Sequence, residues 1–236
     1  MTPEVAAPLV AIPATIAVWL LARRVHRAKP HPLTNPVFLG MAGIILGLGI
    51  LRVDYKTYAK GTSALLFLLK PAVVAFAIPL YRERNRIRNN LAAVLTSVAV
   101  GCVVGIVSAT GLALLLGAPH AIARTMAPKS VTSPIALELS QQIGGMGELT
   151  VGVVIATGIL GAMAGPEWLR LLGIRSRFAI GLAVGAASHG IGVARLEQED
   201  RKAGGDLGKA MGIIAMTLNG LLTALTLPHI LKALGW

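Results

Sequence analysis

The stretch LAAVLTSVAVGCVVGIVSATGLALLLG, residues 91–117, decides the fold class, because it carries no charged side chain over its whole length. A helix that crosses the hydrocarbon core of a bilayer needs about 20 consecutive, mainly apolar residues. Further apolar stretches of similar length lie at residues 5–22, 34–51, 61–81, 147–166, 177–194 and 208–231. The sequence therefore predicts an all-α, polytopic membrane protein with about seven transmembrane helices, formed as a single domain over residues 1–236.

The composition also indicates a membrane protein. Hydrophobic residues make up 55% of the 236 residues and charged residues 14%, whereas soluble domains carry roughly a quarter of charged residues. The mean hydropathy is +0.72. Aromatic residues contribute only 4%, so the apolar mass is small and aliphatic, which suits close packing of helices in lipid. We expect a multi-pass protein of the bacterial inner (cytoplasmic) membrane.

The net charge of +12 does not indicate a nucleic-acid partner. The basic residues lie in short clusters between apolar stretches, as in cytoplasmic membrane loops, and no nucleic-acid motif accompanies them. The first charge is Glu4, so we expect a retained first span with its N-terminus outside, not a cleaved signal peptide. Cys102 is the only cysteine and the five histidines lack ligand spacing, so we expect no metal and no cofactor.

Loop charges predict the topology. With the N-terminus outside, the inside loops are residues 23–31, 82–88 and 167–177, each with a net positive charge, and residues 195–209, which sum to zero, lie outside. Loop 52–60 is an exception, outside but positive. This count requires residues 119–143 to enter and leave the membrane on one side, as a re-entrant broken helix interrupted by Arg124, Pro128, Lys129, Pro134 and Glu138.

This re-entrant element contains the stretch Ala-Pro-Lys-Ser-Val-Thr-Ser-Pro-Ile-Ala, residues 127–136. Proline has no N–H group and clashes with the preceding turn, so Pro128 and Pro134 would break a continuous helix. Thr132 or Ser133 before a proline is typical of a helix start, with a capping side chain and proline in the first turn. We therefore expect the chain to break inside the membrane and to restart as a half-helix.

The start of a half-helix is a site for an anion, because its free N–H groups carry about half a positive charge. Lys129 adds a full charge, which costs roughly 3 kcal/mol or more at membrane depth unless a ligand or partner neutralises it. The carboxylate-binding residues predicted here are Lys129, Ser130, Thr132 and Ser133. The alternatives are that Lys129 reaches an interface or pairs with Glu138, and that the stretch is an ordinary loop between spans.

A second candidate is Ala-Ser-His-Gly-Ile-Gly, residues 187–192, within the apolar stretch 177–194. We predict that Ser188 and His189 contribute to substrate binding and that His189 carries a coupling proton, because a histidine exchanges protons near neutral pH. Glu138 is the other candidate for the proton. The alternative is a neutral His189 bonded to a neighbouring carbonyl. Neighbouring residues do not face each other on a helix, so Ser188 and His189 are no catalytic dyad, and we expect no enzyme.

Three more residues complete the predicted site. Lys70 and Pro71 would form its opposing half, and Asn219 adds a polar group to the apolar stretch 208–231. The alternatives are a proline kink with a lysine facing water, and an interhelical hydrogen bond from Asn219. Residues 61–117 also weakly resemble residues 119–173, and paired interrupted segments are typical of transporters. Chance similarity between apolar stretches is the alternative.

Five segments of the chain resemble the LrgB/CidB family: Asp54-Tyr55 with Tyr58 and Gly61, residues 71–81, residues 128–136, residues 157–161 and residues 187–192. The resemblance covers nearly the whole chain and implies an integral membrane domain. Bacterial members are regarded as antiholin-like regulators of murein hydrolase export that act with an LrgA/CidA-type partner. Plant relatives resemble plastid glycolate/glycerate translocators, and some bacterial members are linked to pyruvate uptake.

The chain departs from the family pattern at Lys70, where a glycine is usual, and at Ser133, Gly190 and Val193. A second intramembrane cation at Lys70 would change the charge preference, so no substrate identity is transferred. We expect a transporter of small monocarboxylates of the glycolate, glycerate, pyruvate or lactate class, with proton coupling as an option. The alternative is an antiholin-like regulator with a separate LrgA/CidA-type membrane protein. The expected partners are the carboxylate and the lipid bilayer; a homo-oligomer stays open, and no nucleic acid is expected.

Overall fold

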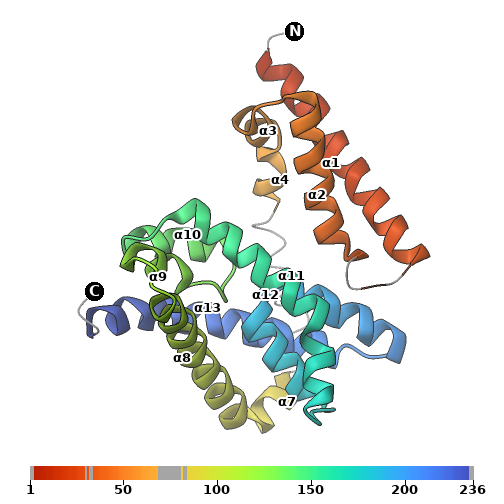
Figure 1. Ribbon diagram of the computed structural model, residues 1–236. Helices are drawn as coiled ribbons and strands as arrows, with labels where there is room; N and C mark the ends of the chain where they lie inside the picture. Colours follow the sequence, from red (N-terminus) through yellow and green to blue (C-terminus); the bar gives the residue numbers. More distant parts are fainter. Residues whose placement is uncertain (1–2, 30, 32–33, 69–80, 82–83, 234–236) are drawn as a thin grey trace. The chain divides into compact units, whose positions relative to one another are not determined.

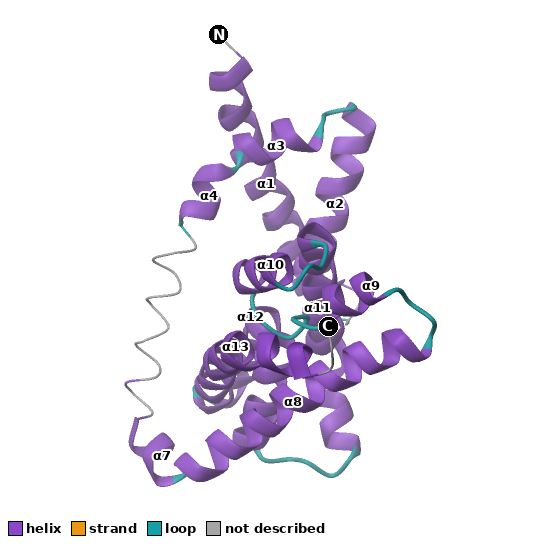
Figure 2. Cartoon of the chain, turned by 90° about the vertical axis from the view of Figure 1, so that its left-hand side faces the viewer, coloured by secondary structure: helices purple, strands orange, loops and turns teal. Residues whose placement is uncertain are grey.

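The computed structural model describes residues 3–29, 31, 34–68, 81 and 84–233, and the regular elements in these ranges are all helices (Figure 1). Figure 2 shows the same helices with the loops and turns of the described residues in teal. The chain divides into two compact units, Met1–Ala77 and Ile78–Trp236. Lys70 and Pro71, predicted to form half of the site, lie outside the described residues, as does most of the expected span 61–81.

The first unit contains α1 (Pro3–Ala28), α2 (Pro36–Leu51), α3 (Tyr55–Gly61) and α4 (Ser63–Phe67). α1 and α2 are antiparallel neighbours, and Asn35 caps α2 by accepting a hydrogen bond from Val37 N at 2.9 Å. The apolar stretches 5–22 and 34–51 are therefore both helical, as predicted. α2 has 16 residues, which is shorter than the roughly 20 of a typical span.

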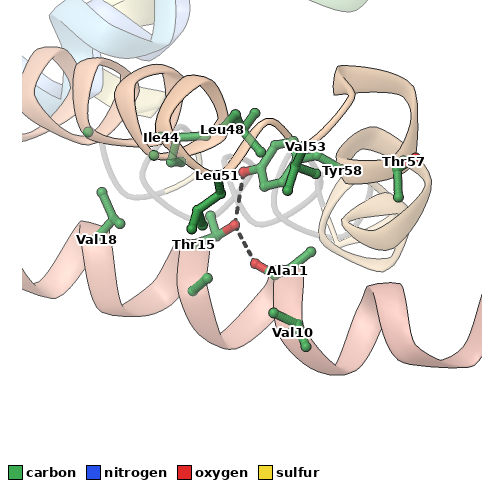
Figure 3. Close-up of a pocket in the computed structure, with 13 residues that line it drawn as sticks. Val10, Ala11, Thr15, Val18, Ile44, Leu48, Leu51, Val53, Thr57 and Tyr58 are labelled. Atoms are coloured by element: carbon green, nitrogen blue, oxygen red, sulfur yellow. Dashed lines mark hydrogen bonds between the residues drawn. The ribbon is translucent and has the colours of Figure 1, made fainter. Parts of the chain in front are cut away.

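A cavity of about 290 Å³ lies between α1, α2 and α3. Figure 3 shows that Thr15 and Tyr58 meet at it, with their hydroxyl oxygens 2.9 Å apart, among aliphatic side chains such as Val18 and Leu48. No charged side chain of the described residues lines this cavity. It is therefore a poor site for a carboxylate, and the candidate site lies in the second unit.

The second unit contains α7 (Arg84–Asn89), α8 (Leu91–Leu115), α9 (His120–Met126), α10 (Ser133–Gln142), α11 (Gly147–Leu171), α12 (Arg177–Ala203) and α13 (Leu207–Ala233). In the described part of the chain, α8, α11, α12 and α13 and residues Leu9–Ala28 of α1 are long and apolar enough to cross a membrane. The predicted spans 91–117, 147–166 and 208–231 are confirmed as continuous helices.

The predicted break in residues 119–143 is also confirmed. α9 and α10 are two short helices separated by residues 127–132, which we call tip 1. The end of α10 and the start of α11 are held at Thr125, at the end of α9 next to tip 1, because Met146 N donates to Thr125 Oγ1 at 2.9 Å and Thr150 Oγ1 donates to the Thr125 carbonyl at 3.0 Å. Thr150 Oγ1 also lies 2.6 Å from Ser140 Oγ at the end of α10. Tip 1 lies beside Gly105, in the second half of α8, and α10 runs from it to Leu227 and Leu231 near the end of α13. We call α9, tip 1 and α10 the first hairpin.

The expectation of a single straight span at residues 177–194 is wrong. His189 has φ 41° and ψ −139° inside α12, so α12 consists of two legs, residues 177–188 and 190–203. Arg177 and Asp200 form an ion pair at 3.7 Å, although a straight helix would separate them by about 35 Å. Leu196 of the second leg packs with Ile180 and Val184 of the first. α12 is therefore a second hairpin, and we call the turn at His189 tip 2.

The two hairpins enter the second unit from opposite ends. α8 and α13 run in parallel, because Val94 packs near Met211 and Cys102 Sγ lies 3.2 Å from Thr223 Oγ1. α11 runs the other way, so the order is span, hairpin, span, hairpin, span. The end of α10 lies near the end of α13, where Leu139 packs with Leu227 and Leu231, and the end of α12 lies near the start of α13, where Asp200 bonds to Lys209 N.

This arrangement corrects the predicted topology at one place. Residues 195–209 lie at the same end as residues 167–177, because Arg195 contacts Glu167 at 2.6 Å. They therefore lie on the same side as residues 167–177 and not on the opposite side, and their net charge of zero leaves the predicted charge asymmetry unchanged. α8 and α11 run in opposite directions, and each is followed by a hairpin. The pairing suggested by the sequence began in residues 61–81, which are largely outside the described residues.

Candidate functional site

The tips of the two hairpins meet at Asn219, in the middle of α13. Asn219 Nδ2 donates to the Ser130 carbonyl of tip 1 at 3.0 Å and to the Ala186 carbonyl, three residues before tip 2, at 3.1 Å. The side chain is 1% exposed. One amide group thus satisfies a backbone carbonyl on each hairpin, which matters in lipid, where no bulk water can do so.

Lys129 is the charged group at this meeting point. It is half-buried in tip 1, and its Nζ donates to Ser130 Oγ at 3.0 Å. No acidic side chain among the described residues forms an ion pair with Lys129, and Glu138, a proposed partner, is exposed on α10. Lys129 therefore remains an uncompensated cation at the depth where the two tips meet.

A cavity of about 870 Å³ leads to this lysine. Its walls are the first half of α8 and the first leg of α12, from Ala93 and Phe178 near the start of α13 to Gly105 and Ala187 at the tips. Lys129 and Ser130 are the residues of tip 1 that line it. Toward the other end the unit is closed by a cluster of buried apolar side chains: Cys102, Ile106, Ala127, Leu139, Leu227 and Leu231.

The other predicted residues of tip 1 shape the backbone. Thr132 is the N-cap of α10 and its side chain makes no capping hydrogen bond, so the first N–H groups of α10 have no side-chain partner. Ser133 begins α10, and Pro134 occupies its first turn as predicted. Pro128 is fully buried at the turn. These residues make the break, while Lys129 and Ser130 reach the cavity.

His189 holds tip 2 against α11. Its ring is 4% exposed, and Nε2 lies 2.9 Å from the Val154 carbonyl. Because a carbonyl oxygen only accepts hydrogen bonds, Nε2 carries the proton in this arrangement and Nδ1 stays available. The positive φ is rare for a residue with a side chain and costs about 1–3 kcal/mol, so the contacts of His189 must hold it in place.

Two glycines of α11 make room for tip 2, a role that the sequence did not reveal. A Cβ atom at Gly158 would lie 2.6 Å from His189 Cε1, and one at Gly161 would overlap the Ser188 hydroxyl. The segment 157–161 was noticed only as part of a family resemblance. The spacing of the two glycines, on one face of a helix, was the available signal.

Paired charges hold the open end of the second hairpin, a second feature that the sequence did not reveal. Arg195 contacts Glu167 at 2.6 Å and Glu199 at 3.1 Å, and Arg170 also pairs with Glu199. The buried Asp200 carboxylate accepts a hydrogen bond from Lys209 N at 2.8 Å. These contacts join the second leg to α11 and to the start of α13, so both legs are anchored at the end of the unit where α13 begins.

Fold and site together define a helical membrane protein in which two helical hairpins meet at a lysine-containing cavity. The LrgB-like family matches residues 15–233, and the chain belongs to this family. The chain is 31% identical over 214 residues to the holin-like protein CidB of Staphylococcus epidermidis, covering 91% of each protein. It is 33% identical over 208 residues to the uncharacterized protein YxaC of Bacillus subtilis, covering 88% of each. No solved structure matches.

The fit between tip 2 and α11 can be tested with a matched pair of substitutions. Gly158→Ala should lower the free energy of unfolding by about 1–3 kcal/mol, because the methyl group overpacks against His189. Gly152→Ala, on the same helix with no atom near its Cβ position, should be neutral or slightly stabilising. Thermal unfolding of the two purified variants in detergent measures the difference. Equal stability of the two variants would mean that tip 2 is not seated on Gly158.

Proposed function

We propose that this protein transports small monocarboxylates and binds the carboxylate group at Lys129. The observation that carries the proposal is the position of this lysine. It lies half-buried at the inner end of a cavity, without an ion-pair partner among the described residues. An uncompensated cation at membrane depth is costly, and a carboxylate ligand would remove that cost while gaining a charge-assisted hydrogen bond.

The start of α10 supports the same ligand. Its N–H groups lie beside tip 1, and the ten-residue helix places the positive end of its dipole next to Lys129. The cavity, about 870 Å³, exceeds the volume of a two- or three-carbon acid, so substrate would enter with water. The other lining residues are uncharged, many of them alanine, valine or glycine, so Lys129 is the charged residue that lines this cavity. Because one positive charge can pair with one carboxylate, this favours monocarboxylates over acids with two charges.

The opposed hairpins support a carrier mechanism. Transporters place their sites near the middle of the membrane, where interrupted helices from inverted repeats meet. Here the cavity extends from the site toward the cytoplasmic end, and the apolar cluster around Leu227 closes the other end. We infer an inward-facing arrangement, from which a rocking of the two hairpins past the site would expose Lys129 to the outside.

A second candidate is a holin-like or antiholin-like membrane regulator. The printed names of the CidB relatives favour it, and the family resemblance implies a separate LrgA/CidA-type partner. Such a protein would form or control a pore instead of a closed binding site. Flux through a pore does not saturate and ignores the structure of the solute, so transport measurements separate the two candidates.

The first test is uptake of labelled glycolate, lactate and pyruvate into proteoliposomes. The wild-type protein should give saturable uptake with an affinity between micromolar and millimolar, about −8 to −4 kcal/mol, because a carrier must release its cargo. Lys129→Ala should abolish it, and Lys129→Arg should restore only part, since a guanidinium has a different shape and reach. Lys202→Ala removes an exposed lysine and should change nothing. Normal uptake by Lys129→Ala would refute the carboxylate site.

The proposal includes proton coupling through His189, with Glu138 as the alternative carrier. Protonation at Nδ1 would add charge near the bound carboxylate and leave the bond from Nε2 to Val154 in place. By linkage, proton and carboxylate would then strengthen each other's binding equally. His189→Gln should therefore keep exchange at equal pH on both sides and lose acceleration by an inward proton gradient.

The matching variant for this test is Glu138→Gln, made in the same vesicles. Accumulation that survives in His189→Gln and fails in Glu138→Gln would assign the proton to Glu138. Accumulation that survives in both variants would mean that neither residue carries it. The bond between His189 and Val154 would then have a structural role alone, which is the alternative that the sequence left open.

A further inference from the structure

Asn219 is the one described side chain that hydrogen-bonds to the backbone of both hairpins. Each of its two amide hydrogens is used, one on the Ser130 carbonyl and one on the Ala186 carbonyl, at 3.0 and 3.1 Å. α13, which carries it, is continuous across the unit, whereas each hairpin turns back at its tip. If either tip moves, its hydrogen bond to the Asn219 amide must therefore break, or the Asn219 side chain must move with it.

Ser130 connects this amide to the proposed carboxylate site. Its hydroxyl accepts the hydrogen bond of Lys129 Nζ at 3.0 Å, and its carbonyl accepts the bond from Asn219. A carboxylate that binds Lys129 would weaken its hydrogen bond to the Ser130 hydroxyl. It would therefore act on Ser130, whose carbonyl is bonded to Asn219. Asn219 also bonds to the carbonyl of Ala186. Ala186 precedes Ala187, which lines the cavity, and lies three residues before His189.

The state of Asn219 Oδ1 is a second, independent observation that supports a role for this residue in movement of the tips. This oxygen is buried and has no hydrogen-bond partner among the described residues. Buried polar atoms without partners are uncommon, and they often mark places where a structure rearranges or a ligand or water enters. A side chain that served only to join two helices would normally have its acceptor satisfied as well. The free acceptor thus allows the amide to exchange partners when the tips move.

We propose that Asn219 is a positioning residue that couples the two hairpins, so that occupation of the Lys129 site in tip 1 changes the conformation of tip 2. This inference rests on the proposed function, because it takes a carboxylate as the ligand. Coupling between two parts of a protein usually corresponds to a factor of roughly 5 to 150. The change at tip 2 should therefore be measurable as a change in the reactivity of a cysteine on the second leg of α12.

The experiment uses two reporter cysteines in full-length Cys102→Ser protein in vesicles. Ala187→Cys lies in the cavity wall, where a bound carboxylate shields it directly. Ala194→Cys lies exposed on the second leg, outside the cavity lining, and can respond only through tip 2. The rate of modification by a small thiol reagent is measured with and without saturating lactate, with chloride as the control anion. Both rates should change, the second by about fivefold or more.

Asn219→Leu, which removes both donors at similar volume, should abolish the response at position 194 and keep the protection at position 187. Thr223→Val removes another buried polar group of α13, one that bonds to neither tip, and should leave both responses intact. If Asn219→Leu does not fold, Asn219→Ser retains a single hydroxyl donor and should reduce the response at position 194.

Any other outcome rejects either the coupling by Asn219 or the proposed function. Protection at position 187 with no response at position 194 would show binding without coupling and reject the role of Asn219. A response at position 194 that survives unchanged in Asn219→Leu, or in Asn219→Ser, would reject it equally. If lactate changes neither rate, no carboxylate binds, and the proposed function fails together with the coupling.

Discussion

Two hydrogen bonds from one amide hold the centre of this protein together. Each hairpin tip interrupts a helix inside the membrane, and each interruption frees backbone carbonyls that lipid cannot satisfy. Asn219 supplies a donor to a carbonyl on each side. This requires both tips to lie at the same depth, against the middle of α13. That constraint fixes how far each hairpin enters the unit, and so it places Lys129 beside tip 2.

Close packing around the tips depends on small residues. Gly158 and Gly161 of α11 leave space for His189 and Ser188, while Gly185 of α12 lies against the backbone at Gly212 of α13. Van der Waals packing of this kind is the main source of helix association in lipid, where burial of apolar surface adds little. Because contacts with α11 and α13 hold tip 2, His189 can keep a backbone conformation that is unfavourable by itself.

The sequence predicted the first hairpin and missed the second, for a physical reason. Pro128 and Pro134 cannot continue a helix, so the break in residues 119–143 was visible in the sequence itself. No proline accompanies His189, and the apolar stretch 177–194 was long enough to pass for a span. The turn there depends on contacts between distant residues, such as Arg177 with Asp200 and His189 with Val154. The position of Lys129 between two prolines was enough to predict it as a site residue from the sequence. Its proximity to Asn219 could not be predicted, because the two residues are 90 positions apart in the chain.

The two tips can meet inside the membrane if the hairpins enter from opposite faces, with both ends of α12 on one face. Single cysteines at positions 118 and 142 mark the ends of the first hairpin, and those at positions 175 and 202 mark the ends of the second, all in Cys102→Ser protein. In intact cells an impermeant thiol reagent should label the first pair from outside and the second pair only after the membrane is permeabilised. Labelling of positions 175 and 202 from opposite faces would mean that α12 crosses the membrane, and it would contradict the meeting of the two tips.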